Sequence, residues 1–168
     1  MRLRQLKASD APEIARLLVH DSEAVQMTAS MSDPMTEAAA CDWIERRTSS
    51  SDQHVFAILL ASSGEFLGSI GLGGPREMPY LGYWIGRPHW NLGYATEAVQ
   101  GLIEYARWLG IPSLQADTFP NNPASARVLA KTGFVNTGKI QINVPLRGGL
   151  RELEHHVIQL GAPQAPGK

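Results

Sequence analysis

The segment with the clearest chemical potential runs from Trp84 to Ala98, where a strand-like run, a turn with a glycine and a long helical pattern follow one another. The first backbone amides of a helix have no partner inside that helix, and the helix dipole favours an anion beside them. Gly93 removes a side chain where a phosphate would approach the backbone, and Ala95 keeps the next turn small. The pattern indicates a phosphate-binding helix N-terminus, although a plain strand-to-helix turn has the same pattern.

Two better-known phosphate motifs do not fit the chain. The sequence contains no GxxxxGK[ST] P-loop. The run at residues 71–76 lacks the last glycine of a dinucleotide fingerprint, and Pro75 would interrupt a helix that began there. A nucleotide-binding protein of another class is therefore the weakest interpretation of this segment.

Composition argues against several other kinds of chemistry. A single cysteine, Cys41, allows neither an intrachain disulfide nor a thiolate metal site. His155 and His156 are neighbours in a strand-like run, so they point to opposite faces and cannot share a metal ion. The formal net charge of -1 provides no broad basic face for nucleic acid. We therefore expect no metal and no nucleic-acid partner.

Length and hydropathy predict one domain away from membranes. The 168 residues suit a single compact domain, which we place at residues 1–161, and the tail at residues 162–168 is expected to be disordered. The N-terminal residues lack the apolar core of a signal peptide, and no stretch approaches the roughly 18 apolar residues of a membrane span. A cytoplasmic protein without membrane contact is the expectation.

The elements that must position the phosphate-binding segment follow from apolar spacing and turn residues. Helical spacing predicts helices at residues 10–20 and 92–109, another after Thr36, and one from Pro123 to Gly133. Asp10 and Glu13 have capping-box spacing, and Thr36 can cap its helix. Strand-like runs are expected at residues 2–7, 55–61, 66–73, 80–86, 114–119, 134–143 and 153–160. The stretch at residues 21–34 has no clear period.

Four blocks of the sequence resemble one known family. Residues 90–95, Trp-Asn-Leu-Gly-Tyr-Ala, resemble the pyrophosphate motif Q/R-x-x-G-x-G/A of the GNAT superfamily of N-acetyltransferases. Trp90 and the continuation into Thr-Glu-Ala are similar to the RimJ/RimL branch, where Trp-Gly-x-Gly is common, and Asn91 replaces the first of those glycines. The other three blocks, in the order expected for this branch, are residues 34–36 with the helix after them, 66–72 and 121–134.

The resemblance implies a fold and a cofactor. It implies the α/β (α+β) GNAT fold, a mixed, mostly antiparallel seven-stranded sheet flanked by about four helices, with acetyl-CoA as the acetyl donor. The pyrophosphate would bind amides of Leu92, Gly93, Tyr94, Ala95 and Thr96. The pantetheine arm would pair with the backbone of Trp84, Ile85 and Gly86, one amide near Ile85 would face the oxyanion, and Asn122 would bond to the arm. Further candidates for cofactor phosphates, with a solvated surface role as the alternative, are Arg87, Arg127 and Lys131.

The catalytic groups that the resemblance implies are incomplete. Many GNAT enzymes carry a tyrosine general acid at the position of Leu129, so the implied proton donor to the leaving thiolate is Ser125, which could instead merely cap its helix. Relatives often place a glutamate at the position of Tyr80. Glu77 is the nearest acid and the candidate base, or else an ordinary exposed acid.

The predicted reaction is acetyl transfer from acetyl-CoA to a primary amine by direct attack on the thioester. At neutral pH roughly a tenth of an α-amine is uncharged, against about one in 2,500 for lysine, so a site without a strong base favours an α-amine. The expected acceptor is a protein N-terminus or an amino-acid-like molecule, bound beside Trp43 and residues 21–34 by a monomer or homodimer. The alternative is a non-catalytic acyl-CoA sensor or interaction domain.

Overall fold

The computed structural model describes residues 1–50 and 52–161, so the expected tail at residues 162–168 lies outside the described residues. The elements, in chain order, are β1 (Arg2–Gln5), α1 (Ala11–Leu18), α2 (Ser22–Gln26), α3 (Glu37–Thr48), β2 (His54–Leu59), β3 (Phe66–Gly73), β4 (Tyr80–Ile85), α4 (Tyr94–Trp108), β5 (Ser113–Thr118), α5 (Pro123–Lys131), β6 (Val135–Val144) and β7 (Gly149–Gln159).

The strands form one seven-stranded sheet in the order β1-β2-β3-β4-β5-β7-β6. Neighbouring strands are antiparallel except β4 and β5, which are parallel. This confirms the mixed, mostly antiparallel sheet expected from the sequence. The described chain has five α-helices where about four were expected, because α2 is only five residues long and too short to show a helical period.

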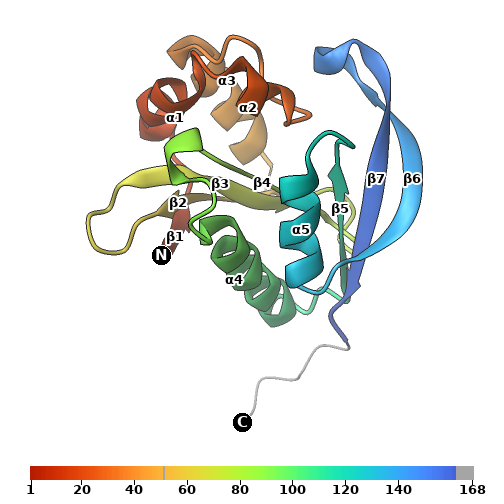
Figure 1. The fold of residues 1–168 in the computed structure, drawn as a ribbon. Coiled ribbons are helices and arrows are strands. Elements are labelled where there is room, and N and C mark those ends of the chain that lie inside the picture. Colours follow the sequence, from red (N-terminus) through yellow and green to blue (C-terminus); the bar gives the residue numbers. More distant parts are fainter. Residues whose placement is uncertain (51, 162–168) are drawn as a thin grey trace.

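Helices cover both faces of the sheet (Figure 1). α1, α2 and α3 lie over one face, where Ile14, Leu18 and Trp43 join a core with strand residues such as Ala57. α4 and α5 cover the other face, where the apolar side of α4 buries Ala98, Val99, Leu102 and Ala106. The sheet therefore separates two packed layers, and a cavity open to both layers has to pass through the sheet.

The parallel ladder between β4 and β5 is interrupted almost at once. β3 and β4 pair over six residues, from Gly73↔Tyr80 to Gly68↔Ile85. β4 and β5 pair only at Tyr80↔Gln115, and beyond that point the two strands separate. The sheet is consequently open beside residues 81–85.

Of the two predicted helix caps, the one at Asp10 is wrong and the one at Thr36 is correct. Asp10 does not form a capping box with Glu13, because its carboxylate accepts from the Lys7 amide at 2.8 Å and from the Arg4 guanidinium at 2.8 and 3.0 Å. Glu13 pairs instead with Arg16 at 2.8 Å. The expected cap at Thr36 is confirmed, since its hydroxyl accepts from the Ala39 amide at 3.2 Å.

The helix α4 starts later in the sequence than expected. The helix begins at Tyr94 and not at Leu92, because Gly93 has a left-handed φ of 85° and Asn91 a left-handed φ of 61°. Such values cannot continue a right-handed helix. Within residues 1–50 and 52–161, no helix is long and apolar enough to cross a bilayer.

Two strand glycines provide a test of the packing between β3 and β4. A Cβ on Gly68 would lie 2.1 Å from the Trp84 carbonyl oxygen and 2.9 Å from Ile85 Cα, so backbone would have to move. We expect Gly68→Ala to lower the free energy of unfolding by about 1–3 kcal/mol in urea titrations. Gly82→Ala is the matched control, because a Cβ there meets nothing within 4 Å. Equal stability of the two variants would contradict this packing.

Candidate active site

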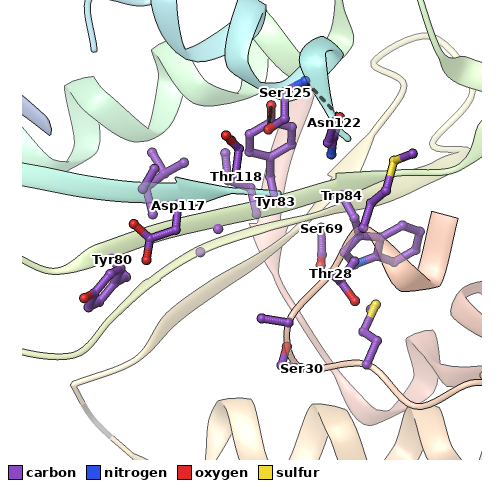
Figure 2. Close-up of a pocket in the computed structure, with 18 of the residues that line it drawn as sticks. Thr28, Ser30, Ser69, Tyr80, Tyr83, Trp84, Asp117, Thr118, Asn122 and Ser125 are labelled. Carbon is purple, nitrogen blue, oxygen red and sulfur yellow. Dashed lines mark hydrogen bonds between the residues drawn. The ribbon is translucent and has the colours of Figure 1, made fainter. Parts of the chain in front are cut away.

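A cavity of about 660 Å³ lies at the opening between β4 and β5 (Figure 2). Both faces of β4 line it: Leu81 and Tyr83 belong to the layer of α4 and α5, and Gly82 and Trp84 to the layer of α1 to α3. The start of α5 and residues 27–31 also contribute to the wall. The cavity therefore passes through the sheet and connects the two layers.

Small side chains create much of this space. Ser69, Gly71 and Gly73 alternate with apolar residues along β3, so they share the face that looks toward α2 and α3. Gly82 of β4 pairs with Gly71, and a Cβ added to Gly82 would meet nothing within 4 Å. The floor of the cavity is bare backbone where larger side chains would fill it.

The backbone at the end of β4 offers one amide to the opening. The Gly86 amide donates to the Leu67 carbonyl at 2.8 Å, so it points toward β3. Amides alternate direction along a strand, so the Ile85 amide points to the opposite side, into the opening. The Ile85 carbonyl accepts from the Trp90 indole at 2.6 Å, which fixes the chain at this point. An amide held in this way can stabilise a developing oxyanion.

The N-terminus of α4 has the conformation that anion binding requires. Gly93 is the N-cap residue with a φ of 85°, and nothing lies within 4 Å of the place where its Cβ would be. Asn91 adopts a left-handed φ that asparagine tolerates better than most residues, which explains how it replaces a glycine. The first amides of this 15-residue helix, from Tyr94 to Thr96, have no intrahelical acceptors.

Ser125 and Asn122 lie at the start of α5 and line the cavity. The Asn122 side-chain oxygen accepts from the Ser125 amide at 3.1 Å, so it caps α5. The Ser125 hydroxyl lies 2.8 Å from the hydroxyl of Tyr83, which reaches across from β4. Burial raises the pKa of Tyr83 to about 12, although its hydrogen bond with Ser125 acts in the opposite direction. A tyrosine hydroxyl is thus present here even though Leu129 is buried and apolar.

Asp117 brings a carboxylate into the cavity from β5. Its Oδ1 lies 2.7 Å from Nδ1 of His155, its register partner on β7, and both side chains are largely buried. Figure 2 shows Asp117 near Tyr80, and the pKa of Tyr80 is raised by burial and by the charge of Asp117. Relatives were expected to carry a glutamate at position 80, and here the neighbouring strand supplies an acid near that place.

Other predicted site residues lie apart from this cluster. Glu77 is exposed in the turn before β4 and does not line the cavity, which makes it a poor candidate for the base. Arg87 is bound by Asp21 at 2.6 and 2.7 Å and by Glu23 at 2.8 Å, which lowers the pKa of Asp21 and leaves Arg87 committed to acids of its own chain. Exposed positions on α5 are occupied by Arg127 and Lys131.

The irregular stretch at residues 21–34 forms one wall of the cavity, on the side where the acceptor was expected. The Trp43 indole of α3 donates to the Ser30 hydroxyl at 3.2 Å. Arg147, in the 3-10 turn between β6 and β7, donates to the carbonyls of Val25 at 2.5 Å and Met31 at 2.8 Å. These bonds explain how a segment with little regular structure keeps a defined shape.

The described parts of the chain contain no group of three or more His, Cys, Asp or Glu residues placed to hold a metal ion. Three cavity-lining polar atoms, Gln53 Oε1, Trp84 Nε1 and Thr118 Oγ1, are buried without a hydrogen-bond partner among the described residues. Buried polar atoms are normally paired, so these three are available to a bound molecule.

Residues 1–135 match the family model described as the acetyltransferase (GNAT) domain. The chain belongs to the GNAT acetyltransferase family. The family and the GNAT fold, both expected from the sequence, are therefore confirmed, and the RimJ/RimL branch stays a prediction.

Curated relatives of this GNAT chain have N-acetyltransferase names. The chain is 30% identical over 109 residues to the probable N-acetyltransferase YjcK of Bacillus subtilis (strain 168), covering 62% of this chain and 60% of YjcK. It is 30% identical over 99 residues to the uncharacterized N-acetyltransferase p20 of Bacillus licheniformis, covering 56% of each. The chain thus spans somewhat more than half the length of these relatives.

Solved structures share the GNAT fold over nearly the whole chain. A putative acetyltransferase from T. thermophilus superposes with a TM-score of 0.82 at 23% identity, covering 95% of this chain and 85% of that one. The ribosomal-protein-S5-alanine acetyltransferase from Vibrio fischeri gives 0.79 at 18% identity, covering 97% and 94%. Spermidine N-acetyltransferase from Vibrio cholerae, in complex with CoA and spermine, gives 0.78 at 15% identity, covering 95% of each chain.

The hydrogen bond between Tyr83 and Ser125 makes a prediction for tyrosine titration. At pH 10.5 an ordinary tyrosine is more than half ionised, whereas Tyr83, with a pKa of about 12, stays neutral. Ser125→Ala should raise the pKa of Tyr83 further, because the lost hydrogen bond favoured the ionised form. NMR of labelled tyrosine rings, assigned with Tyr83→Phe, measures both values. Ionisation of Tyr83 near pH 10, or no change in Ser125→Ala, would refute this arrangement.

Proposed function

We propose that this GNAT chain transfers an acetyl group from acetyl-CoA to a primary amine. The observation that carries the proposal is the cavity through the sheet, which connects the N-terminal side of α4 and α5 with the wall formed by residues 21–34. A thioester bound from one layer and an amine bound from the other would meet there. The described residues fit coenzyme A, because the N-terminus of α4 is open at Gly93 and β4 has an unpaired edge.

Different residues of the cavity would each bind a different part of acetyl-CoA. The amides of Gly93 to Thr96 would hold the diphosphate. The free edge of β4 at Ile85 would pair with the pantetheine arm, whereas the amides of Trp84 and Gly86 point toward β3 and do not offer the expected pairing. The side-chain NH2 of Asn122 would also reach this arm. Acetyl-CoA supplies the activated acyl group, and the Ile85 amide would stabilise the oxyanion that forms on its carbonyl.

Proton transfers in this reaction would fall to Asp117 and Ser125. The neutral amine forms the new C–N bond and the C–S bond breaks. Asp117 accepts the proton that the attacking nitrogen loses, while His155 holds the carboxylate in place. A thiol has a pKa of about 8.5, so its thiolate is a tolerable leaving group, and a hydrogen bond from Ser125 is enough to stabilise it.

We further propose that the acceptor nitrogen is an α-amine. A carboxylate is a weak base, so the reaction favours an amine that is already partly neutral at pH 7. An amino-acid-like molecule or a peptide N-terminus meets this condition better than a lysine side chain. Comparable rates on an N-terminal amine and a lysine side chain at pH 7 would contradict this choice. A cytoplasmic location and a monomeric or homodimeric state remain predictions.

Binding of the donor can be tested by thermal melting. Acetyl-CoA at 100 times its dissociation constant should stabilise the protein by about 2.7 kcal/mol, or several degrees at roughly 2–4 °C per kcal/mol. Gly93→Glu should abolish this shift, because it places a carboxylate where the diphosphate binds. The control Trp108→Glu adds the same charge at an exposed position at the other end of α4 and should keep the shift. Loss of the shift in both variants, or in neither, would contradict the assigned site.

The role of Asp117 can be separated from that of Glu77 by carboxylate-to-amide changes. Asp117→Asn should lower kcat at pH 7 by about 10²- to 10⁴-fold, as expected for loss of a general base. The deficit should be similar at pH 7 and pH 9, because both proteins need the neutral amine and only the proton lost during the attack depends on Asp117. Glu77→Gln should retain most of the activity. A large loss in Glu77→Gln alone would show that Glu77 is the base.

Free thiol release over a panel of amines measures the transfer itself. The non-catalytic acyl-CoA sensor predicts the same melting shift with acetyl-CoA but no thiol release with any amine. Release that depends on the amine, and that Asp117→Asn slows, would exclude the sensor.

A further inference from the structure

Two side chains that line the cavity carry a formal charge at neutral pH within residues 1–50 and 52–161, and they have opposite signs. Asp117 has His155 as its partner and a role in the proposed reaction. Arg47, from the last turn of α3, has neither. A cation that faces an otherwise mostly apolar cavity requires an explanation.

Arg47 makes no ion pair and no hydrogen bond with the described part of the chain. Its guanidinium carbon lies 5.9 Å from the centre of the Trp43 ring, a weak contact for a charge. Burial lowers the pKa of Arg47, and repulsion from Arg46 adds to the effect. Because charged groups are seldom buried without a partner, this guanidinium lacks an anion.

Gln53 is a second polar side chain in the cavity lining that has an unpaired atom. Its side-chain oxygen is buried without a hydrogen-bond partner among residues 1–50 and 52–161. Its side chain packs beside Gly73, at 3.6 Å from the place of a Cβ on that residue. Since the oxygen and nitrogen of a carboxamide exchange places when the group rotates by half a turn, Gln53 can present either an acceptor or a donor to a ligand.

Gln53 and Arg47 both line the cavity, and each lies apart from the proposed cofactor side. Gly73 pairs with Tyr80 at the far end of the β3–β4 ladder from Ile85. Arg47 belongs to α3, in the layer opposite the N-terminus of α4, so the phosphates proposed to bind at α4 are not its anion. The partner of Arg47 must then come from the acceptor side.

We propose that Arg47, assisted by Gln53, binds a carboxylate of the acceptor, so that the substrate is a primary amine that also carries a carboxylate. The proposal rests on the acetyl transfer proposed above. A guanidinium is suited to this role because its planar fork donates two parallel hydrogen bonds to a carboxylate.

The length of β4 limits the shape of this substrate. From Tyr80 to Ile85 a strand extends about 16 Å at roughly 3.3 Å per residue, which is an upper limit for the separation of amine and carboxylate. This length leaves room for an amine and a carboxylate several bonds apart, farther than in a single α-amino acid. A short peptide with a free C-terminus meets this condition and also offers an α-amine.

The test compares dipeptides that have a free C-terminus with the same dipeptides as C-terminal amides. Wild-type protein should use the acids with a kcat/KM about 10-fold to 100-fold higher than the amides, mainly through KM, as expected for hydrogen bonds to a charged group. Arg47→Met should remove this preference by lowering kcat/KM for the acids to about the value for the amides. Arg46→Met is the matched control, because it removes the same charge from an exposed neighbour and should keep the preference. Should Arg47→Met not fold, Arg47→Lys keeps the charge and should lose most of the preference.

Equal use of acids and amides by the wild type, or equal effects of the Arg46 and Arg47 variants, would overturn the carboxylate site while leaving acetyl transfer intact. Absence of thiol release with every amine would overturn the proposed transfer instead. In that case calorimetry decides the carboxylate site, with the same dipeptides titrated into protein saturated with coenzyme A. Binding of acids in preference to amides, lost in Arg47→Met, would support the site, and equal or absent binding of both would refute it.

Discussion

The structure depends on a parallel ladder that stops after one register pair. Because β5 leaves β4 after Tyr80↔Gln115, the backbone of residues 81–85 has an edge in the middle of a sheet. Buried backbone groups need hydrogen-bond partners, so such an edge is stable only if something else binds there. The edge explains the cavity through the sheet, the direction of the Ile85 amide and the placing of α4 and α5 beside the opening. In the proposed reaction, the thioester acetyl-CoA binds along that edge and gives up its acetyl group there.

Strands β4 and β5 supply two functional groups that the family motif would place at other positions. The hydroxyl expected on α5 at Leu129 comes instead from Tyr83 of β4, which reaches Ser125 at 2.8 Å. A carboxylate expected at Tyr80 of β4 comes instead from Asp117 of β5. Both pairs join residues that are far apart along the chain, Tyr83 with Ser125 between β4 and α5, and Tyr80 with Asp117 between β4 and β5. A cavity can therefore hold the same set of chemical groups while the residues that carry them change.

The sequence predicts best those features that depend on interactions between residues near one another along the chain. The Thr36 cap and the helical pattern of α4 depend on residues within a few positions, so local spacing was sufficient for them. The left-handed φ values of Asn91 and Gly93 were not predicted, and they move the start of α4 to Tyr94. The positions of Asp117 and Arg47 depend on which strands and helices pack together, and neither lies in a motif. The Asp10 capping box was wrong for a local reason, because the Arg4 guanidinium and the Lys7 amide already donate to its carboxylate. α2 was missed because five residues cannot display a period.

The most direct measurement of the central claim is an NMR titration of the amide-labelled chain with acetyl-CoA. If the open edge of β4 and the start of α4 bind the thioester, the largest shift changes should fall on the amides of Ile85 and of Gly93 to Thr96. Amides in β1 and β6, at the two edges of the sheet, should change little. Saturable changes confined to other surfaces, with Ile85 and α4 unaffected, would contradict the account.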